Sequence, residues 1–558
     1  MRQTERDRAG SKLPPTLPAL PLDRAQVPQV AAPGAAEGPR VTVRQFDFAG
    51  NRLLGSGALQ SAVAPWLGHA DSVDDLRRAA AAVEQAYRER GWLARALLPV
   101  QDISGGRVRI EIVEARMGRV IVARGSAALP ARLVEQIRLI LAADLPAGQP
   151  LDLHRLERGL IIAGEIPGVL LRGSLAAGAD PARTDLLLEL HPAARTAARV
   201  GIDNGGNRAT GATRLTAQVT ALAPLGGGER LSVALAATEG SAYLGGDASW
   251  PVALAALAQW RIGLHASALE YTVLPGLNPS GGAAPRGHSG VLGVGLEYPL
   301  RRTPFASATL QLGIGARTVV NRNGGPVDPA LPTPADESKA GLLQIGIAAS
   351  RYEPAWGGAT TAGSLTLSAG HLSLAGSPAS AIAADAAYAH TQGGYAVARW
   401  SASHLQPLRP GLALLASAQG QWASTNLDPA EKLYLGGMNG VRAYPTGEAG
   451  GSSGWLLNLE LRRQLGPHWL ASAFVDRGQI EQFRRNAAAA TGAPLLPDNR
   501  ATLGGRGIAL EFRDAQGLVV KASWSHRNGR NPLATPAGTD TDGSLQENRY
   551  WIDASFNF

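Results

Sequence analysis

The sequence contains no cysteine, so it has neither a disulfide framework nor a thiolate metal site. It also has no run of about 18 consecutive apolar residues, which excludes a membrane-spanning helix. Its histidines are scattered without an H-E-x-x-H pattern, and no phosphate-binding P-loop occurs. We therefore expect neither a metal ion nor a cofactor.

One pattern associated with enzymes does occur, but in the wrong setting. Residues 450–454 read Gly-Gly-Ser-Ser-Gly and match G-x-S-x-G, the turn that carries the nucleophilic serine of many hydrolases. That turn needs a strand before it and a helix after it, whereas residues 450–454 end a glycine-rich loop and lead into a strand pattern. The sequence therefore predicts no enzymatic activity.

Length and charge narrow the class of protein further. At 558 residues the chain is too long for a single compact core. The formal net charge is +8, a balance that often accompanies nucleic-acid binding. Because the arginines are spread through strand-like segments and form no single stripe, we do not expect nucleic acid as a partner.

The first 39 residues show no pattern of regular structure. Residues 1–8 lack the apolar stretch of a secretory signal peptide, so an exported chain is expected to have a precursor that begins upstream. Residues 11–39 are rich in proline and alanine, a composition typical of extended tethers. We interpret residues 1–39 as a flexible tether and expect it to be dispensable.

Two consecutive segments share one order of elements. Residues 40–115 read as strand, helix, helix, strand, strand, and the second helix begins at Ser72 with Asp75 three residues on, as in a capping box. Residues 116–193 repeat the same order over a similar length. The pattern favours an internal repeat, with two unrelated small α+β domains as the alternative.

From residue 197 to residue 558 the helical periodicity gives way to strict alternation. Leu457 and Leu459, for example, alternate with Asn458 and Glu460, so one face is apolar and the other polar. This pattern fits a lipid-facing β-barrel around a hydrated lumen, and the segment is long enough for roughly 16 strands of about 10 residues. A soluble β-sandwich or propeller is the alternative, although no blade period appears.

The last nine residues carry the clearest alternation, and they end on the apolar face. Bacterial outer-membrane barrels also end on an aromatic residue of that face. We therefore assign Phe556 and Phe558 to the barrel-closing strand and expect deletion of Phe558 to impair assembly. Six tryptophans are candidates for an aromatic belt at the membrane interface or for the core: Trp250, Trp260, Trp400, Trp422, Trp455 and Trp551.

Two motifs carry a family resemblance. Residues 435–444 read Leu-Gly-Gly-Met-Asn-Gly-Val-Arg-Ala-Tyr, and residues 474–478 read Phe-Val-Asp-Arg-Gly. They resemble the inward L6 loop and the F-x-D-x-G strand of two-partner secretion transporters, the haemolysin/filamentous-haemagglutinin activator family. The family tetrad is Val-Arg-Gly-Tyr, whereas this chain has Ala443 at the glycine position. The order and spacing of the motifs extend the resemblance over residues 40–558.

The resemblance implies a transmembrane antiparallel β-barrel of about 16 strands preceded by two α+β POTRA domains. These are residues 40–115 and 116–193, followed by the barrel at 197–558 with its L6 loop around 436–454. The loop and barrel-wall residues that it implies are Val441, Arg442, Tyr444, Phe474, Asp476 and Gly478.

The chemistry of the two motifs suggests how such a loop is held. A planar guanidinium forms bidentate bonds with a carboxylate, so we expect Arg442 to clamp the loop to Asp476 on the barrel wall. The alternative is that the two residues are separate solvated charges. The added Cβ of Ala443 is expected to alter or strain the tip of the loop.

The function implied by the resemblance is export of one unfolded exoprotein from the periplasm to the cell surface. The barrel would lie in outer-membrane lipid, with the POTRA domains in the periplasm and a single chain sufficient for function. We expect an edge strand of the second repeat, around Val169, Leu170 and Leu171, to bind cargo by β-augmentation, or else to act only as a spacer. An insertase for other barrels and a passive porin are the alternative functions.

Overall fold

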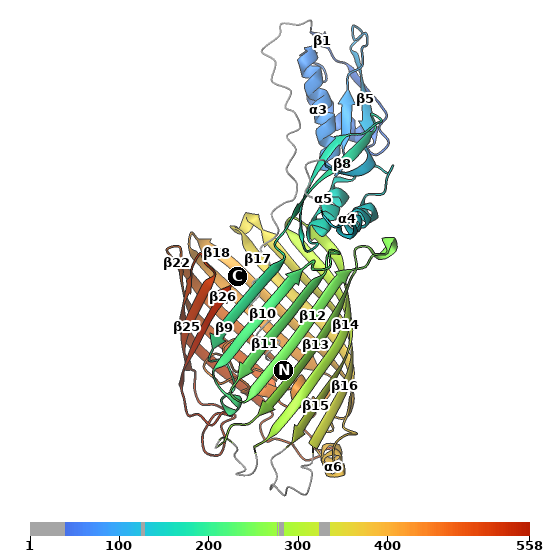
Figure 1. The fold of residues 1–558 in the computed structure, drawn as a ribbon. Helices are drawn as coiled ribbons and strands as arrows, with labels where there is room; N and C mark the ends of the chain where they lie inside the picture. The colour runs from blue at the N-terminus through green and yellow to red at the C-terminus, as the bar shows by residue number, and fades with distance from the viewer. Residues whose placement is uncertain (1–39, 124–128, 276, 278–283, 323–334) are drawn as a thin grey trace.

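A computed structural model describes residues 40–558 except 124–128, 276, 278–283 and 323–334 (Figure 1). Two α+β units are stacked on one end of a barrel, and the C-terminus lies at that same end. None of the helices in the described ranges is long and apolar enough to cross a membrane. The predicted tether, residues 1–39, falls outside the described residues.

The first α+β unit packs two helices against a three-stranded sheet. The sheet has the order β2-β5-β4, in which β2 runs parallel and β4 antiparallel to β5. The predicted capping box is present: the Ser72 hydroxyl accepts the Asp75 N–H, and the Asp75 carboxylate accepts the Ser72 N–H at 2.9 Å. The elements are β1 (Val41–Thr42), β2 (Gln45–Ala49), α2 (Ser56–Val63), η1 (Ala64–Trp66), β3 (Ala70–Asp71), α3 (Val73–Glu89), β4 (Ala94–Leu97) and β5 (Arg107–Glu114).

The second α+β unit repeats this arrangement. Its sheet has the order β6-β8-β7, in which β6 runs parallel and β7 antiparallel to β8. The shared element order and sheet order support the internal repeat over two unrelated domains, and β7 forms one edge of its sheet. The elements are β6 (Arg116–Val122), α4 (Ala131–Asp144), α5 (Leu153–Gly164), β7 (Val169–Ala177) and β8 (Arg183–Pro192).

Sixteen antiparallel strands form a closed barrel, which confirms the predicted fold class. The barrel closes where Asp553–Asn557 of the last strand pairs with the first strand. The strands are β9 (Thr196–Asp203), β10 (Arg214–Leu222), β11 (Arg230–Thr238), β12 (Ser241–Pro251), β13 (Arg261–Thr272), β14 (Arg286–Thr303), β15 (Ala306–Arg322), β16 (Ala335–Glu353), β17 (Ala359–Ser373), β18 (Gly393–Arg409), β19 (Leu412–Ala423), β22 (Ser453–Leu465), β23 (Trp469–Glu481), β24 (Arg500–Arg513), β25 (Leu518–Arg527) and β26 (Asn548–Asn557).

Alternation along the strands separates an apolar outer face from a polar lumen. Leu343, Leu459 and Val475 are exposed on the outside, whereas Glu460 and Asp476 are buried inside. Apolar side chains meet lipid at a lower free energy than charges do, and the carboxylates Glu460 and Asp476 accordingly lie on the inner face.

The second α+β unit is docked on the end of β14 and on the turn between β12 and β13. The Arg158 guanidinium on α5 pairs with Asp144 and donates to the Pro299 carbonyl at 2.8 Å, and Arg302 pairs with Glu165 at 2.7 Å. The Gln136 amide on α4 donates to the carbonyl of Ala258, which is itself part of the unit's apolar core. These contacts hold the second unit against the end of the barrel at which the C-terminus lies (Figure 1).

Candidate functional site

The long loop between β19 and β22 turns into the barrel and lies in the lumen. It comprises residues 424–452, so it begins earlier than the predicted 436–454, and Gly454 already belongs to β22. We call residues 424–452 the lumen loop. Its glycines allow tight folding: a Cβ on Gly440 would lie 2.0 Å from the Leu435 carbonyl oxygen, and Gly437 has φ of 121°.

Arg442 at the tip of the lumen loop binds Asp476 on β23. The Arg442 Nε and Nη2 donate to the two carboxylate oxygens at 2.9 and 2.6 Å, and its backbone N–H donates to the same carboxylate at 3.0 Å. Arg442 is 5% exposed and Asp476 is 0% exposed. The structure therefore brings the two residues together as a buried bidentate pair, and the alternative of separate solvated charges is wrong.

Three further strands, β22, β25 and β26, also bind Arg442. The Glu460 carboxylate on β22 accepts its Nη1 at 2.7 Å, and the Phe474 ring lies 3.3 Å from the guanidinium carbon. The Arg442 carbonyl accepts the Ser525 hydroxyl on β25 and the Trp551 indole N–H on β26, both at 2.7 Å. Every polar group of this residue that the lumen buries thus has a partner, as a buried charge requires.

The apolar residues of the tip form a small core with the barrel wall. Val441, Ala443 and Tyr444 are fully buried against residues of β22, β23 and β24. A Cβ on Gly478 would lie 2.8 Å from the Leu435 side chain, so glycine at this position makes room for the loop. The six predicted loop and wall residues therefore lie in one place.

Ala443 does not strain the tip, contrary to the sequence expectation. It is not among the described residues with positive φ, and its methyl group packs against the wall at Gly505 of β24. A Cβ on Gly505 would lie 2.7 Å from the Ala443 Cβ. A glycine on the wall thus provides the space that the family glycine would leave in the loop.

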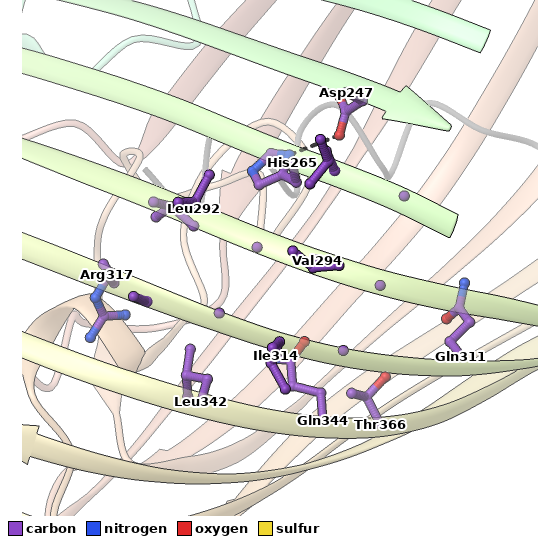
Figure 2. A pocket seen from close by; sticks show the side chains of 18 of the residues that line it. Asp247, His265, Leu292, Val294, Gln311, Ile314, Arg317, Leu342, Gln344 and Thr366 are labelled. Carbon is purple, nitrogen blue, oxygen red and sulfur yellow. Dashed lines mark hydrogen bonds and ion pairs between the residues drawn. The ribbon is translucent and has the colours of Figure 1, made fainter. Parts of the chain in front are cut away.

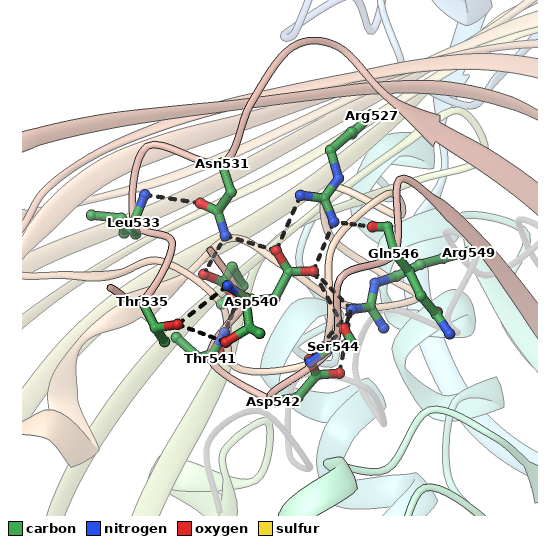
Figure 3. A network of polar contacts seen from close by, with 12 residues as sticks. Arg527, Asn531, Leu533, Thr535, Asp540, Thr541, Asp542, Ser544, Gln546 and Arg549 are labelled. Carbon is green, nitrogen blue, oxygen red and sulfur yellow. Dashed lines mark hydrogen bonds and ion pairs between the residues drawn. The ribbon is translucent and has the colours of Figure 1, made fainter. Parts of the chain in front are cut away.

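The returning limb of the lumen loop is held by the loop between β25 and β26. The Glu448 carboxylate accepts the Asn531 amide at 2.9 Å and the Thr541 hydroxyl at 2.7 Å. Asp540 in the same β25–β26 loop binds the guanidinium groups of Arg527 and Arg549 at 2.8 and 3.0 Å (Figure 3). The Glu448 carboxylate thereby joins the lumen loop to the β25–β26 loop, and Asp540 joins the β25–β26 loop to β25 and β26.

The first limb of the lumen loop borders a cavity of about 1490 Å³ in the lumen (Figure 2). Glycines on the opposite wall leave room for this cavity, because no side chains project from them into the lumen: Gly293, Gly295, Gly313 and Gly315. A second cavity, of about 950 Å³, is lined by tip residues that include Met438 and Arg442. The lumen loop therefore borders two separate cavities of the lumen.

The remaining predicted residues lie away from the lumen loop. Phe556 and Phe558 stand at the end of β26, with ring centroids 4.8 Å apart, and the Phe558 N–H donates to the Ala198 carbonyl of β9 at 2.9 Å. Val169 and Leu171 point into the core of the second α+β unit, whereas Leu170 is exposed on β7.

Four residues that fix the lumen loop to the barrel, two on the wall and two in the loop itself, were not predicted. Glu460 and Trp551 contact Arg442, Glu448 holds the returning limb, and Glu431 holds the first limb. Trp551 was a candidate for the membrane belt, yet it is buried and faces the lumen. The available signal was that Trp551 shares one face of β26 with Asp553 and Ser555, which mark the polar face of that strand.

A serine, a histidine and an aspartate meet in the lumen without forming a hydrolytic site. His265 Nδ1 lies 2.8 Å from Asp247 (Figure 2), and His265 Nε2 lies 3.4 Å from the Ser267 hydroxyl. The backbone of Ser267 is paired with β12 on one side and β14 on the other. Along the described part of β13 the backbone N–H groups are used by these two ladders, so they do not form an oxyanion site beside Ser267.

Comparison with known families gives two matches. Residues 183–496 match the family described as haemolysin secretion/activation protein ShlB/FhaC/HecB, and residues 41–115 match the POTRA domain of ShlB type. The heme/hemopexin transporter protein HuxB of Haemophilus influenzae is 25% identical over 496 residues, which cover 87% of this chain and 81% of HuxB. The outer membrane transporter CdiB of Escherichia coli is 29% identical over 211 residues, 37% of this chain and 34% of CdiB.

Solved structures show the same fold. CdiB from Escherichia coli aligns with a TM-score of 0.68 at 21% identity, over 100% of this chain and 96% of CdiB. CdiB from Acinetobacter baumannii aligns with a TM-score of 0.62 at 16% identity, over 94% of this chain and 91% of that one. A crystal structure of BamA from Haemophilus ducreyi that lacks POTRA domains 1–3 gives a TM-score of 0.53 at 13% identity, covering 93% of this chain and 100% of the BamA chain.

Proposed function

Because this chain belongs to the haemolysin secretion/activation family ShlB/FhaC/HecB, we propose that it exports one large partner protein through its barrel to the cell surface. It is an outer-membrane transporter of two-partner secretion, with its POTRA domains in the periplasm. The proposal adds that the partner is unfolded in transit, that a single chain suffices, and that the apolar outer face lies in lipid.

The observation that carries the proposal is the lumen loop itself. It borders both lumen cavities, and Arg442 binds it to four strands. A protein transporter needs such an element, because its lumen must stay closed between transport events.

The size of the lumen supports an unfolded cargo. The two cavities measure about 1490 and 950 Å³. A folded domain of about 100 residues, with a radius of gyration of about 13 Å, is many times larger. An extended chain fits such spaces, and its folding outside the cell then removes it from the transport equilibrium and gives direction without ATP.

We place the first contact of the cargo on β7. Along the β7–β8 ladder, the Ala193 N–H donates to Gly168 at one end and the Gly178 N–H donates to Arg183 at the other. Because hydrogen-bonded and non-bonded pairs alternate in an antiparallel ladder, the backbone groups of Leu171 point to the free edge. An unfolded chain can pair with these groups, and the exposed Leu170 lies beside them.

Two variants at one position test the cargo contact. Leu171→Pro removes an edge N–H and part of the core packing, whereas Leu171→Ala removes only the packing. We expect Leu171→Pro to reduce secretion several-fold relative to Leu171→Ala at equal barrel abundance. Equal secretion by the two variants would show that the second unit serves as a spacer.

Deletion of the chain tests the function as a whole. We expect one large extracellular protein to disappear from the culture medium while other outer-membrane barrels keep their abundance, both measured by quantitative mass spectrometry. A broad loss of outer-membrane barrels would identify an insertase. An unchanged set of extracellular proteins with reduced uptake of small solutes would identify a porin.

A further inference from the structure

Glu431 joins the first limb of the lumen loop to a different part of the barrel wall. It ends the short 3-10 helix η5 (Pro429–Glu431) and is 1% exposed. Its carboxylate binds the Arg317 guanidinium of β15 and accepts Arg399 Nη2 of β18 at 2.7 Å. Arg317 lies at one end of the larger cavity (Figure 2).

Gln421 completes this second attachment. Its amide nitrogen donates to the Glu431 carbonyl at 3.0 Å, and its amide oxygen accepts Arg399 Nε at 2.8 Å. The wall strands that hold Glu431, β15 and β18, lie on one side of the root of the loop at β19. The strands that hold Arg442 lie on the other side, so the loop is fixed at two separated places.

The two attachments differ in how well their buried charges are satisfied. Each side-chain nitrogen of Arg442 donates to a carboxylate oxygen. Arg317, which is 5% exposed, has two nitrogens, Nε and Nη2, that are buried without a hydrogen bond in the described part of the chain. Its Nη2 is 3.9 Å from Asp428, which is beyond hydrogen-bond reach. Unpaired donors of a buried cation are costly, so the Glu431 attachment is the weaker one.

Packing points in the same direction. The tip around Val441 and Tyr444 belongs to an apolar cluster with β22, β23 and β24, whereas Asp428, Pro429 and Ala430 border the larger cavity. The start of the first limb is anchored at Leu427, which packs in an apolar cluster with β18 and β19. Its later part joins the returning limb through a two-residue ladder, β20 (Leu433–Tyr434) with β21 (Gly450–Gly451). Movement of residues 428–431, between these two anchors, therefore breaks mainly the contacts of Glu431 and its neighbours and enlarges the cavity directly.

We infer that Glu431 is a positioning residue for transport: it latches the first limb of the lumen loop across the barrel, and this latch opens while the Arg442 clamp holds. The role of the latch in transport rests on the proposed function, whereas the opening of the latch can be tested without any exported protein. Opening of the latch widens the lumen beside the glycine-lined wall of β14 and β15. Cargo then passes along that wall, past a tip that stays in place.

Conductance of the full-length protein in planar lipid bilayers provides the first test. Glu431→Gln keeps the shape of the side chain and removes the charge that holds Arg317 and Arg399. We expect the open fraction of single channels to rise about tenfold or more. The matched control is Glu297→Gln, which removes a carboxylate from the wall of the same cavity without touching the loop. Equal open fractions for Glu431→Gln and Glu297→Gln would overturn the inference.

Spin labels provide the second test, and they decide which end moves. The chain has no cysteine, so Pro429→Cys and Asn439→Cys, both at exposed positions, label the first limb and the tip separately. We expect Glu431→Gln to mobilise the label at residue 429 and to leave the label at residue 439 unchanged. Mobilisation of both labels, or of neither, would contradict a separate latch.

A milder variant covers the case in which Glu431→Gln fails to assemble. Arg399→Gln removes one of the two cations that bind Glu431, and we expect a smaller rise in open fraction with the same selective mobilisation of residue 429. No change in either measurement would also overturn the inference. Because neither measurement uses the exoprotein, a chain that opens as expected but exports nothing would instead contradict the proposed function.

Discussion

The two α+β units and the barrel bury opposite kinds of side chain. The cores of the units consist of residues such as Leu160, Leu186 and Tyr87, which are hidden from water completely. The barrel exposes leucines such as Leu343 and Leu459 on its outer face and buries charged groups in its lumen, among them Arg442, Asp476 and Glu431. The units thus obtain stability from removal of apolar surface from water, whereas the inside of the barrel is organised by ion pairs.

This difference decides what a substitution does in each region. A lost methyl group in an apolar core leaves a cavity and weakens the fold of that unit. A lost charge in the lumen leaves its partner buried and alone, while the hydrogen-bonded strands of the barrel stay intact. We therefore expect core variants to fail in folding and lumen variants to fail in closing or transport.

The largest effect is expected when one member of the Arg442–Asp476 pair is removed. Asp476→Asn should weaken attachment of the lumen loop by about 3–5 kcal/mol, because Arg442 keeps its charge without its main partner. The double variant with Arg442→Gln should cost less than the sum of the single variants, since Glu460 still binds Arg462 at 2.8 Å. The temperature at which a protease cuts the loop measures this, and strictly additive costs would argue against a coupled pair.

Exchange of the two charges is not expected to restore the pair. In a variant with Arg442→Asp and Asp476→Arg, the new aspartate would face the Glu460 carboxylate, which binds Arg442 Nη1 at 2.7 Å in the native chain. The neighbouring residue Arg477 would not contact the exchanged pair, because it lies on the exposed outer face of β23. Full secretion by the exchanged variant would show that Glu460 contributes little.

The next effect compares equal truncations in the two regions. Leu186→Ala in the second α+β unit should cost about 2–5 kcal/mol, because Leu186 is fully buried. Leu343→Ala on the outer face of β16, where the leucine is 62% exposed, should cost less, since lipid chains fill the vacated space. Hydrogen exchange of amides in residues 131–190 and in β16 provides the measurement. Similar losses of protection would remove the contrast drawn between the regions.

The smallest effect concerns the closing strand. Deletion of Phe558 removes the hydrogen bond to Ala198 and the edge contact with Phe556, a ring pair worth about 0.5–1.5 kcal/mol. We expect a lower yield of heat-modifiable barrel, while Phe558→Trp retains both contacts and serves as control. An unchanged yield after deletion would mean that pairing of Asp553–Asn557 with β9 closes the barrel alone.

Much of this architecture could be predicted from local sequence patterns. Alternation defines a strand whatever its neighbours are, and the capping box at Ser72 defines a helix start, so the barrel and the repeated units were within reach. The Arg442–Asp476 pair was also within reach, because both residues belong to motifs of a recognised family.

The other lumen contacts depend on geometry that a single sequence does not contain. Glu431 meets Arg317, which lies 114 positions earlier in the chain, only because the barrel closes and the loop turns inward. Likewise, the space for Ala443 comes from Gly505, a glycine that looks ordinary within its strand. Register between distant strands and the course of a long loop decide such contacts, and neither follows from periodicity.

The most direct test of the central claim is export by Arg442→Ala, with secreted partner protein measured per assembled barrel. If buried charge in the lumen governs transport while the strands govern assembly, the variant should assemble at normal levels and secrete at most about a tenth of the normal amount, as expected for loss of a buried charge pair. Normal secretion per barrel would contradict the account, because the lumen loop would then be a filler of the pore and its clamp would have no part in transport.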